Sequence, residues 1–427
     1  MQRRRDYTMT DFSKMLPEML FGDELKAALE AVPEYDDSVR ESDAGTRLLR
    51  ISDIYKIFIP NQMAYEIYHK LYSMAAMSLQ KKGTKDSVRL LNAVHQGKAA
   101  PDAGESYYSD EYRGVATGMT SATCIGISGI GKSTCIQAAI GLLGGTIESD
   151  MPYRKILPVI VVSCPFNCSF RSLCSQILEE TDRFLGTNYY QKSLKSTMNA
   201  EQVMQMVCQV ANLYIGVLVI DEIQMIVESR SGSQLYRMIL QLINSSAISV
   251  LLCGTPECIP FFAQNPQMAR RTVGLQFGPM DYDEGFREFC KILFSYQYVQ
   301  KWTELTDGIL EWLYEYSEAV PATIMALVHD AQEIAILNGK ERLCIETMNE
   351  AYNRRMKMLH PYILPDAKNK RYAAARPERE ESKTDETGIM EDSTGVDIPL
   401  IIRTAKNQGT DIISLLRQYI PVREVIL

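Results

Sequence analysis

Short apolar runs alternate with longer mixed segments between residues 105 and 280. Four runs are continuous and rich in Val and Ile, as strands buried on both faces of a sheet should be. These runs are 124–127, 156–162, 217–220 and 248–252. Helix-length segments lie around 133–143, 170–184, 202–213 and 233–242. The order predicts an α/β domain over 105–280, in which helices sandwich a parallel sheet.

The strand pattern disappears after residue 281. Helices are expected there around 284–297, 305–317, 321–337 and 345–358. A sheet domain followed by helices alone indicates a second unit, which we predict as a helical lid over 281–360.

The segments before the sheet domain have two different patterns. Residues 1–50 combine a basic start with an acidic stretch from Glu34 to Asp43, which predicts a partly disordered arm. From Ile54 to Met74 apolar residues recur at helical spacing, so 51–104 is predicted as a small helical N-terminal unit and linker.

The last part of the chain is charged and then apolar again. Residues 361–396 contain few large apolar groups, which predicts a disordered tether. Apolar runs return at 398–401 and 412–416, so we predict a docking segment over 397–427. Packing of this tip against its own chain is the alternative.

Composition narrows the class of protein. The 427 residues are 46% hydrophobic and 23% charged, as in globular proteins. No segment approaches about eighteen uninterrupted apolar residues and the start is polar, so we expect a cytoplasmic protein with no membrane partner. A net charge of −8 argues against a globally basic nucleic-acid coat, but a local basic surface stays possible.

Ten cysteines are scattered through the predicted strands and helices, and with no export signal we expect reduced core thiols. Cys164, Cys168 and Cys174 lie close together in sequence. Their spacing does not fit a zinc site and no histidine is near, so we expect no metal there.

Residues 126–133 satisfy the phosphate-binding pattern G-x-x-x-x-G-K-[ST], between a predicted strand and a predicted helix. The glycines let backbone N–H groups point at phosphates, Lys132 would bridge the β and γ phosphates, and Ser133 would bind Mg²⁺. A glycine-rich turn without a ligand is the alternative. The predicted ATP-binding residues are Gly126, Ile127, Ser128, Gly129, Ile130, Gly131, Lys132, Ser133 and Thr134.

Two acids follow the apolar run 217–220. A carboxylate at the end of a buried strand is costly unless it meets a cation, so Asp221 is predicted to hold Mg²⁺ through its water shell. Glu222 would then act as the general base on the attacking water. The alternative is that the pair caps the next helix.

Two further positions carry candidate catalytic groups. Thr255 follows the strand 248–252 and could sense the γ phosphate, cap the following helix, or do both. Arg270 and Arg271 precede the apolar segment 273–277, where one of them could be an arginine finger for a neighbouring subunit. Solvated surface charge is the alternative for both arginines.

Taken together, these motifs resemble the AAA+ transposition regulators of the TnsC and TniB type. The resemblance covers about 105–358. It rests on the long gap between the glycine-rich motif at 126–133 and the acidic motif at 221–222, on the run from Asp221 to Gln224, on residues 254–257 and on Arg270–Arg271. It implies that the ATP-bound protein self-associates into a ring or filament around double-stranded DNA. The assembly would link a target-selector protein to a transposase, and hydrolysis would take it apart.

The resemblance also implies DNA contacts after the second strand, where Arg171, Lys192 and Lys195 offer phosphate partners. Ordinary surface charge is the alternative for these three. One departure from many AAA+ proteins is that residues 320–324 contain no arginine to sense the nucleotide from the lid.

Other functions share part of this pattern. A replication-initiator or helicase-loader ATPase has the same motifs, but it should carry an added winged-helix or helix-turn-helix unit, and none is evident after 358. A nucleotide-binding scaffold that does not hydrolyse ATP is a further alternative. Glu222→Gln distinguishes the two, because it should abolish turnover in an ATPase and change little in a scaffold. A metabolic kinase is disfavoured because the sequence has no motif for an acceptor substrate.

Overall fold

The structure is a computed structural model in which residues 11–82, 121–150, 153–164, 169–195, 198–228, 237–242, 248–259, 262 and 274–358 are described. By its internal contacts the chain divides into Met1–Ile363 and Leu364–Leu427, and the description concerns the first unit. The predicted tether and docking segment, and most of the predicted linker, lie outside the described residues.

A six-stranded sheet forms the centre of the α/β part, in the order β2-β3-β4-β5-β1-β6. All neighbouring strands are parallel except β2, which runs antiparallel to β3 at the edge. The strands are β1 (Ser121–Gly126), β2 (Ile147–Asp150), β3 (Tyr153–Ser163), β4 (Ile215–Asp221), β5 (Ser249–Gly254) and β6 (Leu275–Phe277).

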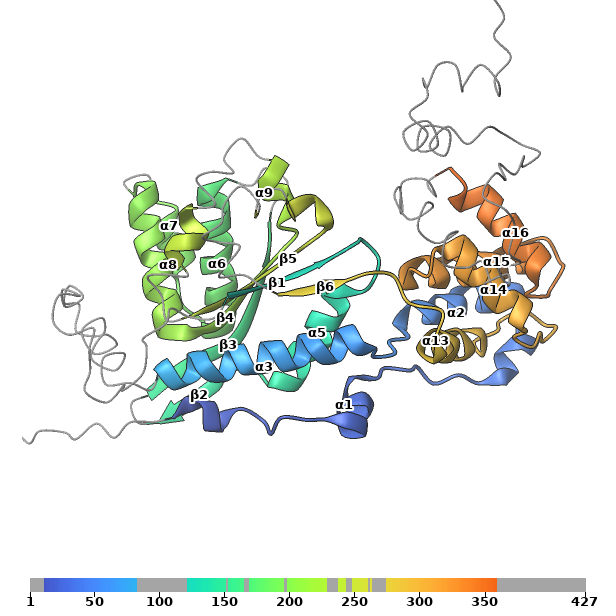
Figure 1. The fold of residues 1–427 in the computed structure, drawn as a ribbon, viewed down its shortest axis with the longest axis horizontal. Coiled ribbons are helices and arrows are strands. Elements are labelled where there is room, and N and C mark those ends of the chain that lie inside the picture. Colours follow the sequence, from blue (N-terminus) through green and yellow to red (C-terminus); the bar gives the residue numbers. More distant parts are fainter. Residues whose placement is uncertain are drawn as a thin grey trace, which may run out of the picture. The chain divides into compact units, whose positions relative to one another are not determined.

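Helices cover both faces of this sheet (Figure 1). On one face lie α6 (Phe170–Leu185) and α8 (Ala200–Tyr214), and on the other lie α5 (Lys132–Leu143) and α3 (Gln62–Lys82). Side chains of β4 alternate accordingly, because Leu218 and Ile220 enter the first core while Val217 and Val219 enter the second. The α/β sheet predicted from the alternating runs is therefore confirmed.

Two of the covering helices are preceded by a residue whose side chain accepts a backbone N–H group of the first turn. Ser169 and Asn199 precede α6 and α8, and each forms a reciprocal pair with the residue three positions later. Such caps stabilise a helix by roughly 1 kcal/mol each. Shorter elements are α7 (Tyr189–Ser193), α9 (Gln224–Glu228) and a 3-10 turn at Pro256–Cys258.

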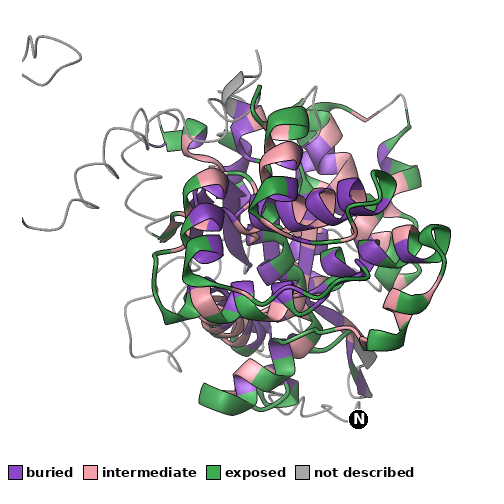
Figure 2. Cartoon of the chain, turned by 90° about the vertical axis from the view of Figure 1, so that its right-hand side faces the viewer, coloured by how far each residue is buried: buried purple, intermediate pink, exposed green. Residues whose placement is uncertain are grey.

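The region after the sheet is helical, as predicted, with a separate apolar core. Its elements are α13 (Glu284–Phe294), α14 (Asp307–Ser317), α15 (Pro321–Leu337), α16 (Ile345–Ala351) and a π-helical turn at Tyr352–Met356. Between α14 and α15 the chain turns through Glu318 and Ala319 in left-handed conformation, and Pro321 opens the next helix. In Figure 2 buried residues line the inner sides of helices whose outer turns are exposed.

Within the described residues no single helix has the length and hydropathy of a membrane span. The α14–α15 pair reaches the required composition only when both halves are combined, and it is bent by 118°.

Residues 11–50 differ from the partly disordered arm that the sequence predicts. They form 3-10 turns at Phe12–Met15 and Asp37–Glu41 and the short helices α1 (Gly22–Leu29) and α2 (Ala44–Arg50). Two acids of the stretch from Glu34 to Asp43 act as caps, because the carboxylates of Asp36 and Asp43 accept backbone N–H groups at 3.0 and 3.1 Å. Asp11 caps the first turn in the same way, at 3.1 Å.

The predicted helix after Ile54 exists, but it is not a separate appendage. α3 packs along α5 and the sheet, and Ile67 and Leu71 are fully buried there. At its end the Lys82 ammonium donates to the carbonyls of Ala211 and Asn212, both at 2.9 Å. This segment is therefore one layer of the α/β part.

Nine cysteines of the described residues are free thiols, and most are buried. Burial raises the pKa of the Cys135 and Cys174 thiols to about 12. These side chains are therefore neutral core groups, in agreement with the prediction of reduced thiols.

Candidate nucleotide-binding site

The loop between β1 and α5 has a backbone that depends on its glycines. Gly129 and Gly131 have φ angles of +83° and +99°, in the left-handed region that other residues rarely adopt. A side chain at Gly126 would collide with Ile130 and would come within 2.9 Å of the Phe277 carbonyl oxygen. The sequence pattern therefore reflects a real steric requirement, and the loop leads directly into the first turn of a twelve-residue helix.

Lys132 lies at the mouth of this loop. Its Nζ donates to the Gly126 carbonyl at 2.6 Å and to the Ile127 carbonyl at 2.9 Å. The ammonium is thus held against the loop that leads into the N-terminus of α5. The free N–H groups of a helix N-terminus favour an anion.

The glycine-rich motif at 126–133 and the acidic motif at Asp221–Glu222 meet at the carboxyl edge of the sheet. The Ser133 hydroxyl donates to Asp221 Oδ2 at 2.8 Å, and the Glu222 N–H donates to Asp221 Oδ1 at 2.9 Å. Asp221 is only 8% exposed. β5 lies between β1 and β4, so its end faces the same place.

Glu222 and Thr255 are joined through a third side chain. Glu222 has a left-handed backbone with φ +58°, and its carboxylate accepts a hydrogen bond from the Gln224 amide. The Gln224 carbonyl oxygen in turn accepts from the Thr255 N–H at 3.2 Å. Thr255 precedes the 3-10 turn, as an N-cap should, but its hydroxyl makes no cap bond.

The sequence assigns no role to Gln224, although it belongs to the acidic motif. The available signal was Gly254 at the end of β5, because a side chain there would come within 2.8 Å of the Gln224 Oε1. A glycine at a strand end marks a close approach by another group, but the sequence does not say which group approaches.

The helical part reaches the phosphate loop through backbone atoms. The Ala322 N–H, in the first turn of α15, donates to the Gly129 carbonyl at 3.1 Å. A side chain at Gly129 would meet Val320 at 3.0 Å and Ala322 at 3.3 Å. Residues 320–324, which contain no arginine, therefore contact the phosphate loop directly.

The remaining predicted site residues are not brought into this cluster. Arg171 donates to the Ser193 carbonyl at 2.9 Å and the Met198 carbonyl at 3.2 Å, so its guanidinium ties α6 to the following loop. The Lys192 ammonium lies 5.2 Å from the centre of the Tyr189 ring, and Lys195 is exposed. Arg270 and Arg271 lie outside the described residues.

Comparison with known proteins fits this geometry. Residues 116–262 match the model of a family described as AAA domain. This segment is an AAA-type P-loop domain. The match includes the phosphate loop, the acidic strand end and the β5 end, whereas the α15 residues that contact the loop lie outside it. Among proteins with curated descriptions, none matches the sequence.

Several solved structures resemble this chain distantly. The Aeropyrum pernix ORC1 protein in complex with DNA has a TM-score of 0.41 and 16% identity, over 56% of this chain and 60% of that chain. A Walker-type ATPase of Pyrococcus abyssi gives 0.39 and 14%, over 60% and 71%. The Thermotoga maritima RuvB Holliday junction branch migration motor gives 0.33 and 14%, over 78% and 83%. This chain spans less than two thirds of the ORC1 chain, and no activity or partner is transferred from these proteins.

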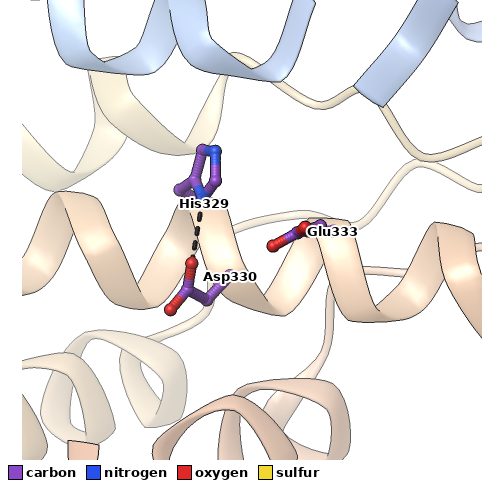
Figure 3. Close-up of side chains that lie close together, drawn as sticks. All are labelled: His329, Asp330 and Glu333. Carbon is purple, nitrogen blue, oxygen red and sulfur yellow. Dashed lines mark hydrogen bonds and ion pairs between the residues drawn. The ribbon is translucent and has the colours of Figure 1, made fainter. Parts of the chain in front are cut away.

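A second cluster of ionisable side chains lies on α15. The ligand atoms of His329, Asp330 and Glu333 lie within 4.8 Å of one another (Figure 3). Arg355 bonds to Asp330 at 2.7 Å and also to Glu333, so one cation already contacts both carboxylates. Burial opposes ionisation of Asp330, but the bonds from His329 and Arg355 outweigh it and hold its pKa below the usual range. We interpret this cluster as an ion-pair network that joins α15 to the π-helical turn.

Proposed function

We propose that this protein binds Mg²⁺–ATP at the AAA domain and hydrolyses it. The observation that carries the proposal is the 2.8 Å hydrogen bond between Ser133 and Asp221. It brings a hydroxyl and a carboxylate, both ligands that Mg²⁺ accepts, to the mouth of the phosphate loop. A buried carboxylate at this position needs a cation or several hydrogen bonds, so the donor set fits the metal.

Each group has a role that follows from its position. The loop N–H groups and Lys132 would bind phosphate oxygens, for which Lys132 exchanges its two carbonyl partners. Ser133 and Asp221 would hold the metal, whose charge neutralises the phosphates. Glu222 would accept the proton of the attacking water, and the Thr255 hydroxyl would sense the γ phosphate from the end of β5.

The test is the substitution Glu222→Gln. It removes the base but keeps the size and polarity of the side chain, so ATP binding should persist while hydrolysis falls about 10²–10⁴-fold. Binding can be measured with a fluorescent ATP analogue and turnover by phosphate release. Glu179→Gln, an exposed change on α6, is the matched control and should leave both unchanged. ATP binding without phosphate release by the wild type would favour a nucleotide-binding scaffold, and equal turnover in the wild type and Glu222→Gln would exclude Glu222 as the base.

Within this activity, we further propose that the ATP-bound protein self-associates on double-stranded DNA as a regulator of transposition. The support is the resemblance of its motifs to TnsC and TniB proteins, with Arg270 or Arg271 as the finger that completes a neighbour's site. Lys192 and Lys195 are exposed, so they are available for phosphate contacts. A transposase and a target selector would be the protein partners.

This second proposal is tested by assembly. Sedimentation with a non-hydrolysable ATP analogue and duplex DNA should give a large complex that ADP does not support. Substitution of both Arg270 and Arg271 by alanine should prevent assembly. A protein that hydrolyses ATP but stays monomeric on DNA under every nucleotide would contradict assembly and leave the ATPase proposal intact.

A further inference from the structure

Gln224 is a buried polar side chain whose two ends are both used. It opens α9, directly after the acidic motif, and is 8% exposed. Its Nε2 donates to Glu222 Oε2 and its Oε1 accepts the Thr255 N–H at 3.2 Å. Glu222 and Thr255 belong to different strand ends, those of β4 and β5, so one amide connects two catalytic elements.

The surroundings fix this amide in place. Gly254 leaves the space that Gln224 Oε1 and the Ile223 side chain occupy, and a side chain at Gly254 would come within 2.8 Å of Oε1. The Ile223 N–H also bonds to the Cys253 carbonyl at 2.9 Å, which holds the start of α9 against β5. Gln224 therefore has little freedom to turn away.

Glu222, in contrast, has few restraints of its own. Its backbone is in the left-handed region, which costs a residue with a side chain about 1–2 kcal/mol, and the residue is exposed. A carboxylate on such a turn could take several orientations. The hydrogen bond from Gln224 selects one of them and leaves Oε1 of Glu222 free to accept another donor.

We propose that Gln224 is a positioning residue, which aims the Glu222 carboxylate at the attacking water and couples it to Thr255 at the end of β5. The inference rests on the proposed ATPase function and deepens it. Movement of the Thr255 backbone on contact with the γ phosphate would be transmitted through Gln224 to Glu222. The base would thus take its working orientation only when the phosphate is in place.

Gln224→Met tests this role, because methionine keeps the volume but has neither amide group. We expect kcat to fall 10–100-fold, as a misplaced catalytic group does, while KM and the Kd of an ATP analogue change by less than about threefold. Gln224→Glu keeps an acceptor for the Thr255 N–H but has no donor for Glu222 at neutral pH, and should show the same loss. A packing role alone predicts near-normal kcat for Gln224→Met.

The decisive measurement combines the changes. If Gln224 acts through Glu222, adding Gln224→Met to Glu222→Gln should lower the residual kcat no further. An independent drop of 10-fold or more in the double variant would overturn the inference, as would wild-type kcat in both single Gln224 variants when Glu222→Gln is inactive. Absence of ATP hydrolysis by the wild type would overturn the ATPase proposal itself, and this inference with it, whereas wild-type kcat in Glu222→Gln would exclude Glu222 as the base and overturn this inference alone.

Discussion

At the residue scale, Ser133 and Asp221 are the pair on which the site depends. They are 88 positions apart in sequence but share one hydrogen bond, because β1 and β4 end at the same edge with only β5 between them. The order of the strands in the sheet brings these two side chains together. Substitution of either residue should therefore change the Mg²⁺ dependence of hydrolysis rather than the stability of the fold.

Ser133→Ala should raise the Mg²⁺ concentration needed for half-maximal hydrolysis at least about tenfold, because the metal loses the hydroxyl that would bind it directly, while Asp221 would hold it only through its water shell. Titration of Mg²⁺ at saturating ATP measures this. Ser73→Ala, on the exposed side of α3, is the control and should leave the Mg²⁺ titration unchanged. An unchanged Mg²⁺ dependence in Ser133→Ala would exclude this serine as a ligand.

Sequence alone predicts the residues whose pattern carries their chemistry, and it misses those whose role depends on a neighbour. The motifs predict Lys132 and Ser133 at the start of a helix and Asp221 and Glu222 at the end of a strand, and the structure has them at the start of α5 and the end of β4. Gln224 was missed because glutamine has no fixed use, and only the space left by Gly254 shows what its amide does. For Arg171, the carbonyls that it bonds come from residues about 20–30 positions later, which no local pattern reveals.

At the element scale, the contact between the phosphate loop and α15 replaces a side-chain sensor. The bond from Ala322 N–H to Gly129 O joins two backbone groups, so no residue type in the sequence indicates it. It makes the position of α15 depend on the loop conformation. Nucleotide that rearranges the loop should therefore also move the helical part.

Gly129→Ala should disturb both the phosphate loop and α15, since φ +83° disfavours any side chain and the added methyl would meet Val320 and Ala322. We expect at least a tenfold loss of ATP-analogue affinity, measured by fluorescence titration. Gly141→Ala in α5 is the matched control, because a methyl there meets nothing within 4 Å. That change should keep the affinity and stabilise the protein by about 0.5–1 kcal/mol.

Helices and strands were predictable where they are long and apolar. α13, α14 and α15 begin within about two residues of the predicted positions, because each has a capping residue or proline at its start. β2 was missed, since an edge strand of four residues with one large apolar side chain has no run to detect. For α3 the apolar stripe predicted a buried face but could not say which surface covers it.

At the scale of the whole molecule, the N-terminal segment joins two cores. Phe12 and Leu16 enter the core between the sheet and α3, whereas Ile51 and Ile54 enter the core of the helical part. Arg47 fixes the middle of the segment, with a paired contact to Glu341 at 2.6 and 2.8 Å and a bond to the Tyr298 carbonyl at 3.0 Å.

Arg47→Met should destabilise the protein by about 3–5 kcal/mol, because Arg47 is 2% exposed and its loss leaves Glu341 without its buried partner. The Arg47 hydrogen bond holds the pKa of Glu341 below its usual 4.5. The contribution of the pair is therefore complete above pH 4.5 and is lost as pH falls through the lowered value.

Urea unfolding at pH 7 and at successively lower pH measures both effects. The difference between wild type and Arg47→Met should shrink on acidification. Arg183→Met, at the exposed pair with Glu180, is the control and should change stability by less than about 0.5 kcal/mol. A pH-independent difference for Arg47→Met would mean that packing, not charge, explains the loss.

The joining role of residues 11–82 sets a practical limit on dissecting the protein. A fragment trimmed to the matched segment 116–262 would lack α3, and the apolar surfaces of α5 and of the sheet that α3 covers would face water. Exposed patches of this kind cause aggregation. Recombinant fragments for biochemical work should therefore keep Phe12, Leu16 and α3, which belong to the core around the sheet, and the helices of the second core.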